Sequence, residues 1–201
     1  MQPIIITIGR QFGSGGHEIG KLVAEKLGIP FYDRELLAEA AQRSGMTKDM
    51  LESFDEQPTN SFLYSLSMGT YSFGGEWHLP LNNQVFLAMT EAIRGVAAKG
   101  SCVIVGRCAE YVLSDNPDVV RVFIHADFDA RVKRIMETRS LSEKEASSLI
   151  QKTDKRRANY HNFYSDSKWG AIGSYDLLFN STLLGVDMVA ELLTHYAQNR
   201  K

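Results

Sequence analysis

The chain of 201 residues is long enough for one domain with a substantial core, and 44% hydrophobic with 23% charged residues is typical of a globular protein rather than a disordered one. A formal net charge of -2 provides no chain-wide positive field, which argues against duplex nucleic acid as a partner. No apolar run reaches the roughly 20 residues that span a bilayer. We also find no signal-peptide pattern, and Cys102 and Cys108 lack metal-site spacing, so we expect a cytoplasmic protein without a membrane partner.

The N-terminal segment carries the most informative pattern. An apolar, β-branched run at residues 3–8 predicts a buried strand, and apolar residues at helical spacing predict a helix over 16–27. Between them lies a glycine-rich run, which would let backbone N–H groups at the helix N-terminus bind an anion. The predicted phosphate-binding residues are Gly13, Ser14, Gly15, Gly16, His17 and Glu18.

This loop fits a mononucleotide P-loop better than a dinucleotide fingerprint, because Glu18 stands where the third small residue of the latter belongs. His17 takes the place of the usual lysine. A histidine is shorter, but with a reference pKa near ~6.5 it would gain a proton beside phosphate and could still donate to it. We therefore expect the affinity for phosphate to weaken as the pH rises through neutrality.

The next segment changes character. Residues 29–32 predict a short strand, and Asp33 is expected to cap a helix that begins at Arg34. After a short helix at 47–54, the stretch 61–78 is rich in serine, glycine and aromatic residues without a clear period. Such a segment is either a binding insertion or a surface excursion, and its aromatic side chains either stack on a base or form a small core of their own.

The second half alternates between helices and strands. We expect helices over about 82–99, 109–113 and 185–199, and strands over 101–106, 119–125 and 175–180. Asp127 can cap a helix that runs to about 139, and Ser142 with Glu145 forms a capping-box pattern before a long helix. This alternation predicts an α/β fold with a parallel sheet, in which residues that follow the strands, such as Gly9, Asp33 and Arg107, gather at one edge.

Several arginines are candidates for binding an anion at that edge. Arg107 follows a strand and can bind phosphate in a bidentate manner. Asp154, Arg156 and Arg157 belong to a concentrated basic segment that either covers the developing charge of a transferred phosphoryl group or forms a solvated helix face. The same choice holds for Arg131 and Arg134. Without HExxH or CxxC patterns we assign no protein-bound metal site.

Taken together, three blocks resemble the cytidylate kinase-like family of the P-loop nucleoside monophosphate kinase superfamily. They are the glycine loop with Phe31-Tyr32-Asp33-Arg34, the Val103-Ile104-Val105-Gly106-Arg107 segment, and the Asp154-Lys155-Arg156-Arg157 segment. The resemblance implies one three-layer domain over 1–201 with a five-stranded parallel sheet of order 2-3-1-4-5. It also implies an acceptor-binding insertion at 45–81 and a lid at 140–170.

The resemblance further implies phosphoryl transfer from ATP, with nucleotide-bound Mg²⁺, to a CMP- or dCMP-like nucleoside monophosphate or a similar small acceptor. Residues 13–18 would hold the donor. The implied substrate-binding residues are Asp33, Arg34, Arg107 and Asp154, and the implied catalytic ones are His17, Arg131, Arg156 and Arg157. The family pattern is departed from in three places. His17 for lysine keeps open a nucleotide-binding protein with little or no turnover, while Cys108 for an aspartate and the lack of a base-reading pattern at 45–81 leave the cytosine specificity open. Another P-loop group transfer, such as from a sulfated nucleotide, is the weaker alternative.

Overall fold

The computed structural model describes residues 3–56 and 80–200, and the predicted aromatic-rich segment 61–78 lies outside them. A five-stranded sheet forms its centre, with the order β2-β3-β1-β4-β5 and parallel pairing throughout. The predicted sheet type and order are therefore confirmed. The strands are β1 (Ile5–Arg10), β2 (Phe31–Tyr32), β3 (Cys102–Val105), β4 (Val119–His125) and β5 (Leu177–Asn180).

The helices follow the predicted alternation. They are α1 (Gly16–Leu27), α2 (Glu35–Ser44), α3 (Lys48–Phe54), α5 (Leu81–Ala97), α6 (Ala109–Val112), α7 (Phe128–Arg139), α8 (Glu143–Tyr164) and α9 (Ser181–Asn199), with a short 3₁₀ turn at Ile172–Ser174. The capping box of α8 is confirmed, since the Ser142 N–H donates to Glu145 Oε2 at 2.9 Å and Ser142 Oγ accepts from the Glu145 N–H. Helix α9 starts four residues earlier than predicted, at Ser181, and contains a non-helical Gly185.

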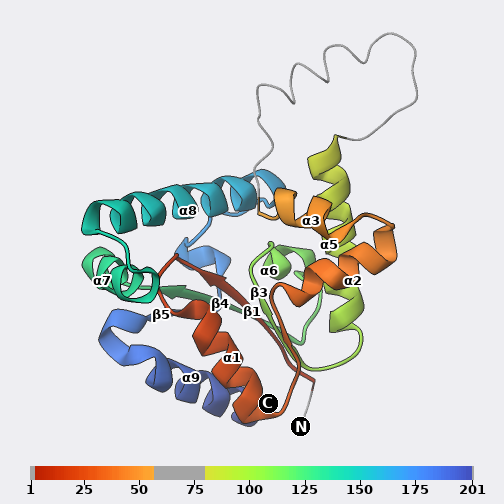
Figure 1. The fold of residues 1–201 in the computed structure, drawn as a ribbon. Coiled ribbons are helices and arrows are strands. Elements are labelled where there is room, and N and C mark those ends of the chain that lie inside the picture. The colour runs from red at the N-terminus through yellow and green to blue at the C-terminus, as the bar shows by residue number, and fades with distance from the viewer. Residues whose placement is uncertain (1–2, 57–79, 201) are drawn as a thin grey trace.

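Helices cover the sheet on both faces, and β1 shows why (Figure 1). Because successive side chains of a strand point to opposite faces, Ile4, Ile6 and Ile8 pack into a core with α1 and α9, whereas Ile5 joins a second core with α2 and α5. All six residues of β1 are buried. A continuous β-branched run is what a strand covered on both faces requires.

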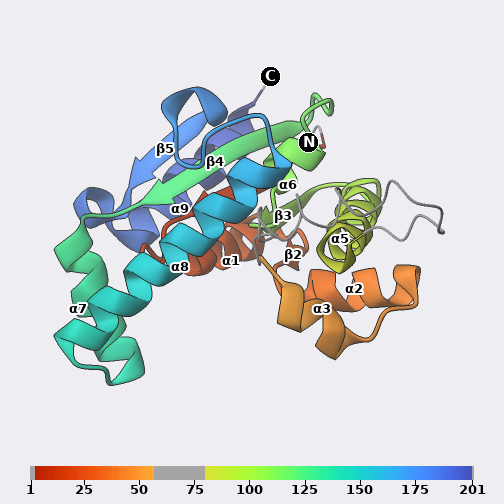
Figure 2. The same cartoon turned by 90° about the horizontal axis from the view of Figure 1, so that it is seen from above.

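Helices α7 and α8 pack against each other, and α8 extends from α7 across the sheet toward α6 (Figure 2). The third core, formed by Val132, Ile135, Ala146 and Ile150, lies between these two helices. No helix within the described residues is long and apolar enough to cross a membrane.

Two predicted caps are wrong. Asp33 does not cap α2, whose N-cap is Arg34, because its carboxylate is bound by His17 and Arg107 instead. Asp127 does occupy the N-cap position of α7, but its side chain makes no capping bond and accepts from Asn180 Nδ2 at 3.1 Å. Both carboxylates found tertiary partners that a local reading of the sequence could not reveal.

Candidate functional site

The glycine loop between β1 and α1 has the backbone geometry of an anion cradle. Gly13 and Gly15 adopt φ values of 81° and 80°, in the left-handed region that favours glycine. A Cβ atom on Gly16 would lie 2.6 Å from Arg10 Cβ, so only glycine fits there. Gly15 is the N-cap of α1 and has no side chain with which to occupy the N–H groups of the first turn. These groups are therefore open to a phosphate.

The loop is held in place by α7 and α8. Asp154 Oδ1 accepts from the Phe12 N–H at 2.7 Å, and Asp154 Oδ2 lies 2.6 Å from Arg131 Nη1. Arg131 also donates to the carbonyl oxygen atoms of Ala126 at 3.1 Å and Phe12 at 3.3 Å. Its side chain is only 7% exposed, so the alternative of a solvated helix face is wrong for Arg131. In this structure Arg131 and Asp154 shape the loop.

Arg134, by contrast, lies over the loop with its side chain partly exposed. It forms an ion pair with Glu18, and its Nη1 atom would be 3.2 Å from a Cβ on Gly15. This arrangement places a guanidinium group beside the open helix N-terminus and balances the negative charge of Glu18. It also adds a cation where a bound triphosphate would need one.

A second network centres on Arg107. Its Nε and Nη2 atoms donate to the two carboxylate oxygens of Asp55 at 2.9 and 2.7 Å, and Nη1 donates to Asp33 Oδ1 at 2.8 Å. The side chain is 2% exposed. Burial alone would lower the pKa of Arg107, but the charges of Asp55 and Asp33 outweigh burial and raise it. Arg107 is therefore a permanently charged group whose donors are occupied by carboxylates.

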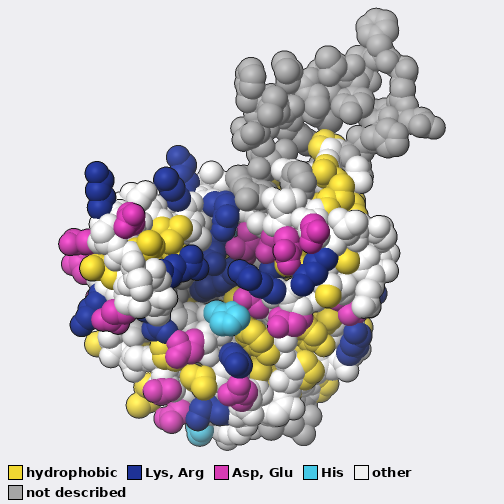
Figure 3. Space-filling view, viewed as in Figure 1, with side chains coloured by type: hydrophobic (Ala, Val, Ile, Leu, Met, Phe, Trp, Pro, Cys, Tyr) yellow, Lys and Arg dark blue, Asp and Glu magenta, His cyan; other side chains and the backbone are white. Residues whose placement is uncertain are grey.

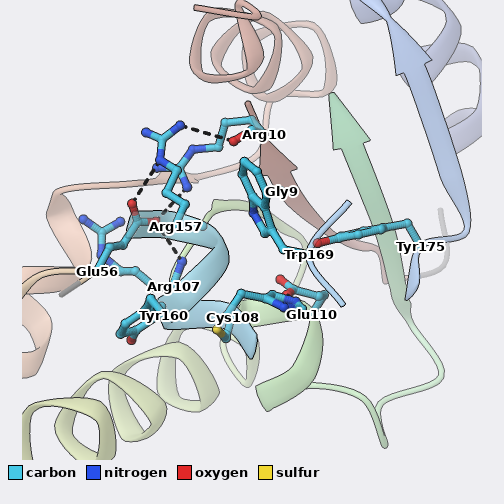
Figure 4. Close-up of a pocket in the computed structure, with 12 residues that line it drawn as sticks. Gly9, Arg10, Glu56, Arg107, Cys108, Glu110, Arg157, Tyr160, Trp169 and Tyr175 are labelled. Carbon is cyan, nitrogen blue, oxygen red and sulfur yellow. Dashed lines mark hydrogen bonds and ion pairs between the residues drawn. The ribbon is translucent and has the colours of Figure 1, made fainter. Parts of the chain in front are cut away.

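Glu56 connects this network to the strand and to α8 (Figure 4). Its Oε1 atom accepts from Arg10 Nη1 at 2.7 Å and from the Arg107 N–H at 3.3 Å, and Oε2 accepts from Arg157 Nε at 3.3 Å. Burial alone would raise the pKa of Glu56, but the charges of Arg10, Arg157 and Arg107 lower it, so the group is ionised at neutral pH. For Arg157, burial and the charge of Arg10 lower the pKa to about 10.

A cavity of about 20 Å³ lies beside this cluster, lined among others by Gly9, Arg107, Glu110, His161 and Tyr175. That volume holds about one water molecule. The cavity is therefore far too small for a nucleotide. Cys108, also in its wall, is buried in a left-handed conformation, and burial together with the charge of Glu110 raises its pKa.

Charged side chains of both signs gather on the face where α1, α3 and α8 meet (Figure 3). Arg156 of α8 differs from its neighbour Arg157, since its Nε atom is buried and has no hydrogen-bond partner among the described residues. Arg34 is exposed at the start of α2. The structure thus brings His17, Asp33 and Arg107 into one chain of contacts, and Arg131, Asp154 and Arg157 against the glycine loop.

Three members of this site were not predicted from the sequence: Arg10, Asp55 and Glu56. Arg10 directly follows a glycine at the end of the first strand, which was a usable signal. The two carboxylates directly follow α3. Glu56 is 46 residues from its partner Arg10, and Asp55 is 52 residues from its partner Arg107. No local pattern indicates such pairs.

Comparison with known proteins agrees with this architecture. The model of the cytidylate kinase-like family matches residues 5–183. The chain belongs to this family. A cytidylate kinase from Archaeoglobus fulgidus is 26% identical over 203 residues, which cover 98% of this chain and 96% of that one.

Solved structures extend the comparison. An uncharacterized protein from Eubacterium ventriosum is 36% identical, with a TM-score of 0.74 over 98% of this chain and 99% of its own. A shikimate kinase from Bacteroides thetaiotaomicron shares 15% identity and a TM-score of 0.54 over 97% and 98% of the two chains, which is a likeness of fold. Family and fold together support a kinase-like enzyme that uses nucleotides.

Proposed function

We propose that this protein transfers a phosphoryl group from ATP to a nucleoside monophosphate of the CMP or dCMP type. The observation that carries the proposal is the open N-terminus of α1, formed by a loop in which Gly13, Gly15 and Gly16 allow close approach of a phosphate. Arg134 lies against this loop, and Arg156 has a buried Nε atom without a partner in the described part of the chain. The related archaeal cytidylate kinase supports the choice of acceptor.

The chemistry of the step fits these residues. The bond between the γ-phosphorus of ATP and the oxygen that bridges to the β-phosphate breaks, and a bond from an acceptor phosphate oxygen to the γ-phosphorus forms, releasing ADP. A phosphate acceptor needs no general base, so positioning and charge stabilisation are the tasks of the protein. We assign donor binding to residues 13–18 with His17, and stabilisation of the developing charge to Arg156 and Arg134.

Magnesium would enter with the nucleotide. Within the described residues there is no group of three or more histidine, cysteine, aspartate or glutamate side chains that could hold a metal ion. Bound to the phosphates, Mg²⁺ would neutralise part of their charge next to Glu18. Arg131, Asp154 and Arg157 then act indirectly, by holding the backbone of the loop that faces the donor.

The test is an assay of phosphoryl transfer from ATP with Mg²⁺ to CMP, dCMP, UMP and AMP, with ATP binding measured by calorimetry in parallel. Transfer to CMP or dCMP is the expected result. Transfer to UMP or AMP alone would contradict the proposed acceptor while leaving the kinase activity intact. Binding of ATP without transfer to any of them would contradict the proposed function.

Two observations favour a second candidate, a nucleotide-binding protein with little turnover. Arg10, Arg107 and Arg157 are all bound by carboxylates, and a histidine stands where P-loop kinases carry lysine. The variant His17→Lys separates the two functions. A large gain in activity would identify His17 as a weakened catalytic site. Without a gain, a wild-type protein that transfers phosphate is a kinase adapted to histidine, and one that binds ATP without transfer is a nucleotide-binding protein.

A further inference from the structure

His17 is held by a specific contact rather than left as a free surface residue. It is the second residue of α1, and its Nδ1 atom lies 2.7 Å from Asp33 Oδ2. The imidazole ring also forms a T-shaped contact with the ring of Phe31, with centroids 5.2 Å apart and an angle of 88° between the planes. Because an imidazole has one nitrogen on each side, a bond at Nδ1 leaves Nε2 for a ligand. The His17 side chain is 60% exposed, so a ligand can reach it.

Asp33 is itself fixed from the other side. Its Oδ1 atom accepts from Arg107 Nη1 at 2.8 Å. Arg107 in turn donates to both carboxylate oxygens of Asp55. The Asp33 side chain is 14% exposed. With one oxygen bound to Arg107 and the other to His17, this carboxylate cannot rotate without breaking a buried ion pair.

The ionisation of Asp33 sets the direction of its bond to His17. Burial alone would raise the pKa of this carboxyl, but the hydrogen bond with His17 and the charges of Arg107 and Arg10 lower it well below its usual range. An ionised carboxylate can only accept hydrogen bonds. The proton between the two groups must therefore sit on Nδ1 of His17.

We infer that Asp33 is a positioning residue for the phosphate donor: it holds the Nδ1–H of His17 so that Nε2 faces phosphates bound at the N-terminus of α1. This inference rests on the proposed function insofar as the donor binds at this loop. It moves Asp33 from the acceptor side, where the family resemblance places it, to the donor side. Arg107 then acts two steps from the phosphate, by holding Asp33.

The bond to Asp33 would make His17 a rigid hydrogen-bond donor, whereas the usual P-loop lysine is a long and flexible one. A P-loop lysine reaches the phosphates through a flexible chain, whereas a histidine is shorter and depends on the direction of its ring. A carboxylate bound to the ring nitrogen that does not contact the ligand fixes both the tautomer and the ring orientation, as it does for histidines that bind metals. In His17 that nitrogen is Nδ1. A fixed ring orientation would thereby compensate for the shorter reach of His17 compared with lysine.

The first test needs only the wild-type protein. ¹⁵N NMR spectra at about pH 8, where an ordinary imidazole is neutral, distinguish the two tautomers. The His17 signals are identified by their loss in the variant His17→Gln. We expect the proton on Nδ1. A proton on Nε2 would overturn the inference, and this readout does not depend on whether any Asp33 variant folds.

The second test is a double-mutant cycle on ATP binding, measured by calorimetry for His17→Gln, Asp33→Asn and the double variant. We expect each single change to weaken ATP binding by roughly 10-fold, and the double variant to be no weaker than His17→Gln, because Asp33 acts through His17. Losses that multiply, or a change in the acceptor KM without a change in ATP binding, would overturn the inference.

Asp176→Asn is the matched control. This carboxylate is also bound by an arginine, Arg121, at 2.6 Å, but it precedes β5 and has no described contact with the glycine loop. Its substitution should leave ATP binding unchanged. If no acceptor is phosphorylated, the proposed function fails, while binding of ATP to these variants still decides the role of Asp33.

Discussion

Two arginines of this protein make the same contact in opposite surroundings. Arg107 binds Asp55 through Nε and Nη2 at 2.9 and 2.7 Å, and Arg121 binds Asp176 through the same two atoms at 3.1 and 2.6 Å. The Arg107 side chain is 2% exposed, whereas both members of the second pair are 39% exposed. The geometry is alike, so depth in the molecule decides what each pair contributes.

The buried pair is tied to an unusual backbone. Gly106, Arg107 and Cys108 all adopt positive φ values, of 77°, 57° and 55°. For a residue other than glycine this conformation costs about 1–3 kcal/mol and persists only where surrounding contacts enforce it. The bond from the Arg107 N–H to Glu56 and the two ion pairs of its side chain supply such contacts. Arg121 of the exposed pair lies on the regular strand β4, so no contact is needed there to hold a strained backbone.

The largest expected effect comes from breaking the buried pair. Arg107→Met removes the cation that neutralises Asp33 and Asp55, and leaves two carboxylates in a largely dry site. We expect a loss of about 3–5 kcal/mol in the free energy of unfolding, measured by urea denaturation. A loss below about 1 kcal/mol would mean that water reaches the network, and the contrast with Arg121 would disappear.

Arg156 tests whether an arginine without a carboxylate partner serves catalysis instead. Its Nε atom has no partner among the described residues, in contrast to Arg157 one position further. We expect Arg156→Ala to lower kcat about 100- to 1000-fold, because it removes a donor from the developing charge, with stability changed by no more than about 0.5 kcal/mol. The control is Lys155→Ala on the exposed side of α8, which should retain full turnover. Equal rates for both variants would remove Arg156 from the reaction.

The buried network also makes stability depend on pH, through Glu56. Its pKa is lowered in the folded state by Arg10, Arg157 and Arg107 despite burial, so its ionisation stabilises the fold above its unfolded pKa near ~4.3. That stabilisation is lost as the pH falls below about 5. Asp55 opposes this trend in part, since burial raises its pKa. Unfolding free energies measured between about pH 3 and 6 should fall less steeply in Glu56→Gln than in the wild type.

The smallest effect is expected for the exposed pair. Arg121→Met should cost about 0.2–1 kcal/mol, because both partners keep most of their hydration and salt screens their attraction. The same urea experiment applies, repeated at about 1 M salt, where the difference from the wild type should shrink further. A loss as large as that of Arg107→Met would show that burial does not govern these pairs.

The periodicity of this sequence determined its fold to a large extent. The β-branched run of the first strand, the capping box at Ser142 and the stop of the first helix at Gly28 are local patterns, and the structure contains all of them. The glycine loop was visible for the same reason, because its backbone conformation depends on glycine at fixed positions. Local rules gave wrong side-chain caps at Asp33 and Asp127.

The pairing of charges was decided by the tertiary structure alone. Asp33 is 74 residues from Arg107, and Asp154 is 142 residues from Phe12, so no spacing along the chain could reveal these contacts. The sequence does not show whether the side chain of an arginine is exposed to water or buried in a network of ion pairs. Its energy and its role follow from burial and from the direction of its donors, which exist only once the sheet brings its strand ends together.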